Sequence, residues 1–166
     1  MKRLFAFLSL LAVALSAAPF EENIFFPPEK MPDEGFYPGM KNELAPKPGS
    51  PEEKALKVVY PEYKQKGDPE WPAVYFNKPN FNGANLDGWD AFAFSVYNPQ
   101  PEVVDLGVCL DGSNKRWTKH IMLEPYWNRI MLPVSEFRGT TGDSLVKFDL
   151  FMTRPAKERG RSIQVE

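Results

Sequence analysis

The sequence is poor in the residues that build most metal and redox centres. It contains one cysteine, Cys109, and one histidine, His120, among 166 residues. A single cysteine excludes an internal disulfide framework and a cysteine-built zinc site, and a single histidine excludes a histidine-cluster metal centre. The formal charge is −2, so the broad basic field of a nucleic-acid-binding protein is missing and we expect no nucleic-acid partner. The GxSxG, HExxH, phosphate-binding-loop and dinucleotide motifs do not occur.

Proline, in contrast, is abundant, with 17 residues in the chain. This is about twice ordinary usage. Because proline breaks helices and interior strands, its density argues against a helical bundle or a doubly wound α/β enzyme. The composition is otherwise that of a globular protein, with 43% hydrophobic and 14% aromatic residues.

Residues 1–18 have the three parts of a secretory signal peptide. Lys2 and Arg3 form a basic start, an apolar stretch follows, and small residues close the segment. The apolar run of about a dozen residues is short for a membrane span. We therefore expect cleavage, no membrane span afterwards, and a secreted or periplasmic protein. In that compartment Cys109 is expected to be a small buried residue and not a nucleophile.

Residues 19–53 are predicted to form a proline-rich extended arm, because neither helical nor strand periodicity holds there. Ser50 could cap a single helical turn near the end of this arm. A pure linker would not carry the apolar residues that lie within 20–37, namely Phe20, Ile24, Phe25, Phe26, Phe36 and Tyr37. These side chains are expected to contact either the domain or a protein partner, and the sequence does not separate the two.

Residues 54–166 are predicted to form one all-β domain. Short runs with period-two alternation of apolar and polar residues are separated by turn-forming segments. Such a pattern, without a long amphipathic helix, predicts an antiparallel β-sandwich or jelly roll. The expected strands lie within 56–63, 72–77, 91–98, 103–111, 116–123, 128–134, 145–152 and 162–166.

Four segments of this domain resemble carbohydrate-binding modules with the galactose-binding-like jelly-roll fold. They read WDAFAFSVYNP, LGVCLDGSNKRW, LEPYWNRIMLPVSEFRG and LVKFDLFMTRP. The turn from Pro125 to Asn128 matches the family's Pro–aromatic–Trp–Asn turn, and Ile130, Leu132, Pro133 and Phe137 match the strand that follows it and its exit. The resemblance covers roughly residues 56–166. It implies a carbohydrate partner and a non-catalytic role, and it consists of hydrophobic spacing and turns without a catalytic fingerprint.

Sugar-binding sites combine exposed aromatic platforms with polar side chains that make directional hydrogen bonds. Trp117, which follows a polar loop, and Trp71 are the candidate platforms. The alternative for each tryptophan is a packing role. The polar candidates, which could equally be solvated turn residues, are Asp111, Asn114, Arg116 and either Asn80 or Asn82.

The resemblance also implies a structural calcium ion beside the first and last strands. Calcium prefers oxygen ligands from loop carboxylates and carbonyls. The conceivable donors are Glu62, Asp68 and Glu166, the last standing where the family has an acidic residue. His120, without a second histidine or cysteine, is expected to make a local hydrogen bond.

These observations favour a secreted, non-catalytic carbohydrate-binding module with a shallow aromatic site for a polysaccharide or glycan. Two alternatives remain open. One is a structural or protein-interaction module of a larger exported assembly, which would bind its partner through residues 20–37. The other is a small glycoside hydrolase or the accessory domain of one.

Overall fold

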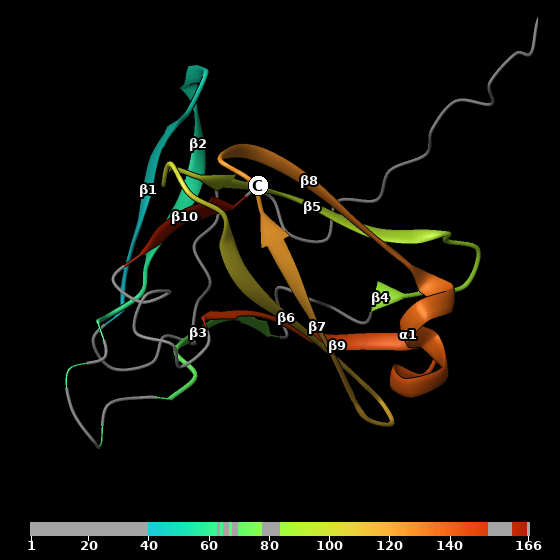
Figure 1. Ribbon diagram of the computed structural model, residues 1–166. Coiled ribbons are helices and arrows are strands. Elements are labelled where there is room, and N and C mark those ends of the chain that lie inside the picture. Colours follow the sequence, from blue (N-terminus) through green and yellow to red (C-terminus); the bar gives the residue numbers. More distant parts are fainter. Residues whose placement is uncertain are drawn as a thin grey trace, which may run out of the picture.

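A computed structural model describes residues 40–62, 64, 67, 70–77, 84–152 and 161–165. In this part of the chain, two antiparallel sheets pack face to face as a sandwich (Figure 1). The predicted all-β sandwich is therefore confirmed. The expected signal peptide and residues 20–37 lie outside the described residues, and both remain predictions. No helix in the described ranges is long and apolar enough to span a membrane.

The first sheet has the strand order β1-β2-β10-β5-β8, and the second has the order β3-β9-β6-β7, with β4 also paired to β9. Every strand pair in both sheets is antiparallel. The strands are β1 (Lys41–Lys47), β2 (Ser50–Val59), β3 (Ala73–Asn77), β4 (Ala84–Asn85), β5 (Ala91–Asn98), β6 (Val104–Gly112), β7 (Arg116–Leu123), β8 (Tyr126–Pro133), β9 (Ser144–Met152) and β10 (Ser162–Val165).

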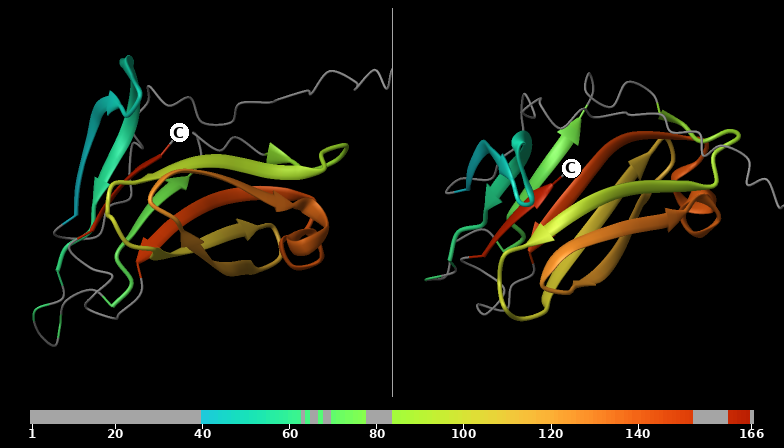
Figure 2. Two further views of the ribbon diagram at one scale, coloured as in Figure 1. Left: turned by 45° about the horizontal axis from the view of Figure 1, so that its top comes forward. Right: turned by 90° about the horizontal axis from the view of Figure 1, so that it is seen from above.

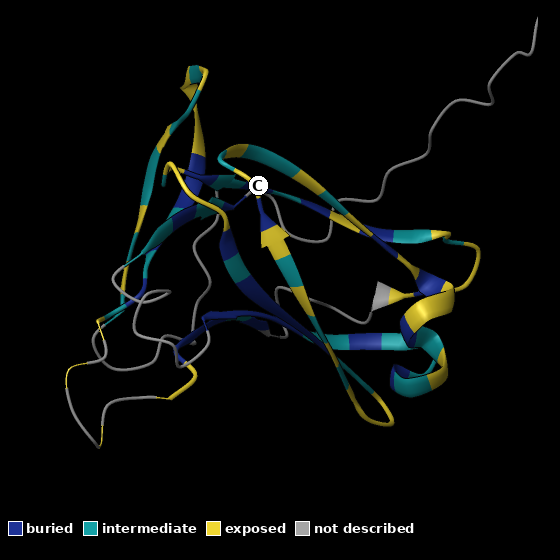
Figure 3. Ribbon diagram, in the orientation of Figure 1, coloured by how far each residue is buried: buried dark blue, intermediate teal, exposed yellow. Residues whose placement is uncertain are grey.

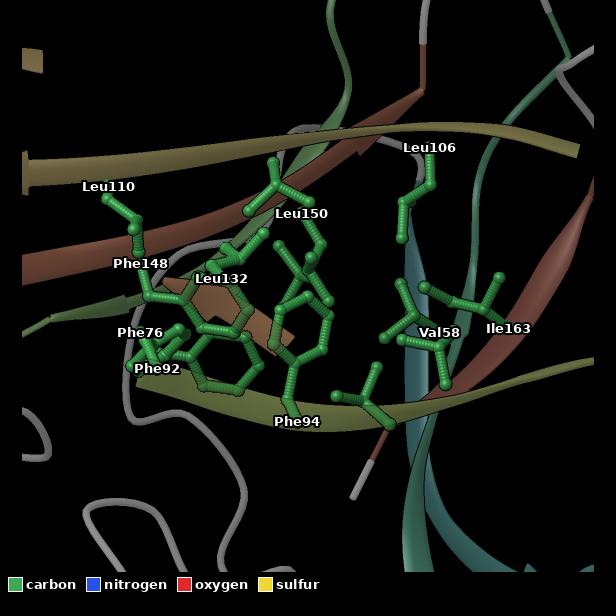
Figure 4. Packing of buried hydrophobic residues seen from close by; sticks show 14 of the residues in the cluster. Val58, Phe76, Phe92, Phe94, Leu106, Leu110, Leu132, Phe148, Leu150 and Ile163 are labelled. Carbon is green, nitrogen blue, oxygen red and sulfur yellow. The ribbon is translucent and has the colours of Figure 1, made fainter. Parts of the chain in front are cut away.

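The core lies between the sheets and follows from the alternation in the sequence. Phe92, Phe94 and Val96 of β5 all point inward and are buried. They meet Phe148 of β9, whose ring centroid lies 5.1 Å from that of Phe92 and 4.9 Å from that of Phe94. Figure 4 shows this aromatic group at one end of the core and Val58 with its aliphatic neighbours at the other. In Figure 3 the central strands β6 and β9 are largely buried, whereas the edge strand β7 is not.

The sandwich begins earlier than the sequence indicated. Residues 41–53, expected to belong to an extended arm, form β1 and the first part of β2, so the predicted helical turn near Ser50 is wrong. Pro46 obscured β1, but it lies at a register shift of an edge strand, where a missing N–H group is tolerated. Gly49, with φ of +91°, closes the hairpin in a conformation that favours glycine.

A short helix, α1 (Val134–Thr141), follows β8 and was not expected. It lies at the end of the sandwich opposite the β1–β2 hairpin, as both views of Figure 2 show. Its Phe137 is fully buried and packs into the core. Two helical turns containing Gly139 carry too weak a periodic signal to be recognised in the sequence.

The buried Asn98 connects the end of β5 to the loop before β6 and to the end of β7. Its Nδ2 donates to the carbonyl oxygens of Glu102 at 2.9 Å and Leu123 at 3.1 Å. Its Oδ1 accepts from the backbone N–H of Gln100 at 3.0 Å. Asn98 belongs to the segment WDAFAFSVYNP, one of the four on which the family resemblance rests, and these bonds give it a structural role there.

Replacing Asn98 with alanine is expected to lower the free energy of unfolding by about 2–3 kcal/mol, because two carbonyl groups and one N–H group lose their buried partner. Asn85→Ala is the control, since Asn85 is exposed and makes one local bond to the N–H of Asp87. That variant should lose less than about 1 kcal/mol. Urea denaturation measures both variants, and an equal loss of stability in the two would contradict the structural role given to Asn98.

Candidate functional site

The outer face of the second sheet carries a hollow of about 310 Å³. Strand register places the side chains of this face in rows that cross the sheet. The middle row consists of Tyr75, Asp149, Cys109 and Thr118, from β3, β9, β6 and β7 respectively. All four line the hollow. Residues far apart in the sequence are therefore brought to one surface by pairing alone.

One wall of the hollow is aromatic. Trp71 lies two residues before β3 and is 51% exposed. Its ring makes an edge contact with Phe151 of β9, with a centroid distance of 5.8 Å. Phe151 in turn covers Gly107, where an added Cβ would fall 2.1 Å from the phenyl ring. Glycine at that position therefore allows Phe151 to lie against the sheet and support an exposed tryptophan.

The other wall is charged, and its charges are paired. Arg116 forms a bidentate salt bridge with Asp111, in which Nε donates to Oδ1 at 2.6 Å and Nη2 donates to Oδ2 at 2.8 Å. This hydrogen bonding lowers the pKa of Asp111. Lys147 lies with its Nζ 3.1 Å from Oδ2 of Asp149, and Nη2 of Arg116 lies 3.7 Å from the same oxygen. Two cations and two carboxylates thus face each other in this wall.

Asp149 is the most buried charged group of the site, with 5% of its surface exposed. Among the described residues its Oδ1 has no hydrogen-bond partner. Burial raises the pKa of Asp149, and the attraction of Lys147 and Arg116 offsets this rise only in part. Burial also raises the pKa of the Cys109 thiol, which lies 3.1 Å from the Thr118 hydroxyl, so the thiol stays protonated at neutral pH. A protonated, hydrogen-bonded thiol does not favour nucleophilic chemistry.

No protein-family model and no curated protein sequence matches this chain. Several solved structures match it. A family 11 carbohydrate-binding module from Clostridium thermocellum, in complex with a β-1,3-1,4-mixed-linked tetrasaccharide, aligns with a TM-score of 0.57 and 12% identity over 80% of this chain and 81% of that one. The family 11 module of the cellulosomal cellulase Lic26A-Cel5E of the same organism aligns with a TM-score of 0.55 and 12% identity, over 80% of each chain. A family 30 module aligns with a TM-score of 0.50 and 9% identity over 82% of this chain and 92% of that one.

The chain has the fold of carbohydrate-binding modules. The resemblance noted in the sequence is thereby confirmed at the level of the jelly-roll sandwich. At these identities the match concerns the fold alone, and the chemistry of the hollow depends on the residues of this chain.

Of the sequence candidates, three lie at the hollow. Trp71 and Arg116 line it directly, and Asp111 holds Arg116 in place. Trp117 faces the opposite side of β7, where it packs on the core with its ring centroid 5.7 Å from that of Phe137 in α1. Neighbouring residues of a strand point to opposite faces, so Trp117 points away from the face on which Arg116 and Thr118 line the hollow. The two expected platforms are thus separated. Trp117 therefore does not contribute to this surface.

Two further residues singled out in the sequence, Asn114 and His120, do not line the hollow. Asn114 lies in the β6–β7 turn, where its backbone N–H donates to the carbonyl oxygen of Thr141 at 3.2 Å. Asn80 and Asn82 lie outside the described residues. Strand pairing places the exposed His120 next to Gly107, with its Nδ1 2.9 Å from Oδ1 of Asp105. This contact is the local hydrogen bond that the sequence predicted.

The calcium expectation remains a prediction. Glu62 lies near Lys64, with 3.7 Å between Oε2 and Nζ. Asp68 and Glu166 lie outside the described part of the chain. Within that part, no three His, Cys, Asp or Glu residues gather as a metal-binding group.

Most of the hollow is formed by residues that were not candidates from the sequence, namely Tyr75, Thr118, Lys147, Asp149 and Phe151. A signal for three of them was present, because Lys147, Asp149 and Phe151 alternate with the apolar residues of β9 and must face away from the core. The alternation does not show which strands lie beside β9, because this depends on the order of strands in the sheet.

The two carboxylates of the charged wall should give opposite pH dependences of stability. Because the pKa of Asp149 is raised in the folded protein, its protonated carboxyl contributes to stability. This contribution is fully present at pH values below the ordinary aspartate pKa and is lost as pH rises through the raised pKa. Relative to the wild type, Asp149→Asn should therefore gain stability as pH rises from about 3 to 7. The pKa of Asp111 is lowered, so its ionised carboxylate stabilises the fold at pH values above the ordinary aspartate pKa. Asp111→Asn should therefore lose stability relative to the wild type over the same pH range. Chemical denaturation at several pH values measures both slopes, and slopes of the same sign would refute this account of the wall.

Proposed function

We propose that this protein is a non-catalytic carbohydrate-binding module and that the hollow on the outer face of the second sheet is its glycan site. The observation that carries the proposal is the exposed Trp71, supported by Phe151 at the edge of a hollow whose opposite wall is polar. A sugar ring has an apolar C–H face that stacks on an aromatic ring and a rim of hydroxyl groups that hydrogen-bond to polar side chains. The two walls supply both.

The charged wall supports a neutral glycan as the ligand. Arg116 and Lys147 are each held by a carboxylate, so the wall carries no uncompensated positive charge, and the guanidinium of Arg116 supplies its N–H donors. Guanidinium and carboxylate groups make stronger hydrogen bonds to hydroxyls than neutral groups do. Thr118, at the edge strand of the sheet, adds a hydroxyl.

The arrangement of the acids supports a binding role over catalysis. Glycoside hydrolysis requires one carboxyl group on each side of the scissile bond, with at least one free to protonate or attack. The Asp111 carboxylate is engaged on both oxygens by Arg116, and Asp149 is buried beneath Lys147. The signal-peptide pattern in residues 1–18 further supports a role outside the cytoplasm, where polysaccharides are met.

Replacing Trp71 with alanine is expected to weaken glycan binding on the order of tenfold, because the ligand loses its stacking surface. Isothermal titration of the full chain against a panel of neutral and acidic polysaccharides is the measurement. Wild-type affinity should lie in the micromolar to millimolar range, since an open hollow excludes little water.

Two aromatic variants serve as matched controls. Tyr126→Ala removes an aromatic side chain that is 69% exposed at the start of β8, in the other sheet. Trp117→Phe keeps an aromatic ring against Phe137. Both should bind as the wild type does. Loss of binding in Trp117→Phe but not in Trp71→Ala would place the site near Trp117 and α1 instead of at the hollow. Absence of binding to any glycan would refute the function.

A further inference from the structure

The Tyr75 ring in the middle row of the hollow is covered by a lysine. Nζ of Lys147 lies over this ring, 4.4 Å from its centroid. The ring also packs against the small cluster formed by Ala73, Cys109 and Phe151. Tyr75 is therefore held firmly on the floor of the hollow, with an ammonium group over its π system.

Strand register explains why Lys147 lies there. Asp149 is paired directly with Tyr75 across β9 and β3, and Lys147 lies two residues from Asp149 on the same face of β9. A buried carboxylate requires a nearby cation, and Lys147 is the closest, at 3.1 Å from Oδ2. In reaching Asp149 the lysine places its ammonium over the ring beside it. Its side chain is only 24% exposed, in agreement with a held position.

We infer that Tyr75 is a second sugar-stacking subsite, capped by Lys147, and that the lysine must leave the ring before a glycan can use it. The inference rests on the proposed function. An ammonium group and the C–H face of a sugar are attracted to the same electron-rich face of an aromatic ring, so they compete for it. Tyr75 follows Trp71 along the chain and lines the same hollow, so a glycan that stacks on Trp71 and extends along β3 reaches the capped ring next.

The cap limits affinity, which leads to an unusual expectation for a residue that lines a binding site. Lys147→Ala should bind a neutral oligosaccharide on the order of two- to fivefold more tightly than the wild type, because the cation–π contact no longer has to be broken. Tyr75→Leu should have little effect alone and should abolish the gain in the Lys147→Ala background. Lys147→Arg should retain the cap and bind no more tightly than the wild type.

Two further variants control for charge and folding. Lys119→Ala removes a positive charge that pairs with Glu136 of α1, away from the hollow, and should leave affinity unchanged. Because Lys147→Ala removes the nearest cation of Asp149, the double variant Lys147→Ala/Asp149→Asn provides an uncapped site without a buried charge. It should also bind more tightly than Asp149→Asn alone.

Titration calorimetry of these full-length variants, with NMR of the wild type, tests the inference. In the free protein the ε-methylene protons of Lys147 should be shifted upfield by the Tyr75 ring and should lose this shift at glycan saturation. A retained shift, or unchanged or weaker binding by both uncapped variants, would overturn the capped subsite. Such a result together with lost binding in Trp71→Ala would leave the proposed function intact. Absence of glycan binding in the wild type would refute both.

Discussion

The alternation of side chains along β9 is the constraint on which the rest of the molecule depends. Phe148 and Leu150 enter the core on one side of this strand, and Lys147, Asp149 and Phe151 form the hollow on the other. Because β9 lies between β3 and β6, a shift of one residue in its register would bury the charged residues and expose the core. The burial of apolar surface that stabilises the sandwich therefore also positions the candidate site.

The hollow contains a buried carboxylate, that of Asp149, together with the cations that stabilise it. A carboxylate as buried as Asp149 is costly, and the cost is reduced by Lys147 and, at longer range, by Arg116. Arg116 is itself oriented by Asp111. The contact between Lys147 and Asp149 also holds an ammonium group over Tyr75, whereas Trp71 is exposed. Charge pairing on this sheet thus covers the Tyr75 ring.

Much of the fold could be read from the sequence because each signal was local. Period-two alternation located the strands from β2 to β10 other than the two-residue β4, and β5 and β7 have the bounds that were expected. The segment WDAFAFSVYNP contains Asn98, which bonds three backbone groups. The Pro–aromatic–Trp–Asn turn contains Asn128, whose side chain bonds both the N–H and the C=O of Glu124. The hairpin strand β1 and helix α1 were missed, since proline and the short length of the helix weakened their local signals.

The sequence by itself determined the class of fold, most of the strands and the side of each strand that faces the core, because these depend on residues that are neighbours along the chain. Only the tertiary structure decided which outward-facing residues meet. It separated Trp117 from Trp71, although both are tryptophans of one domain, and it joined Tyr75, Asp149, Cys109 and Thr118 from four strands. The physical reason is that a binding surface on a sheet is built across the strands, and the order and register of strands depend on long-range pairing that no single segment encodes.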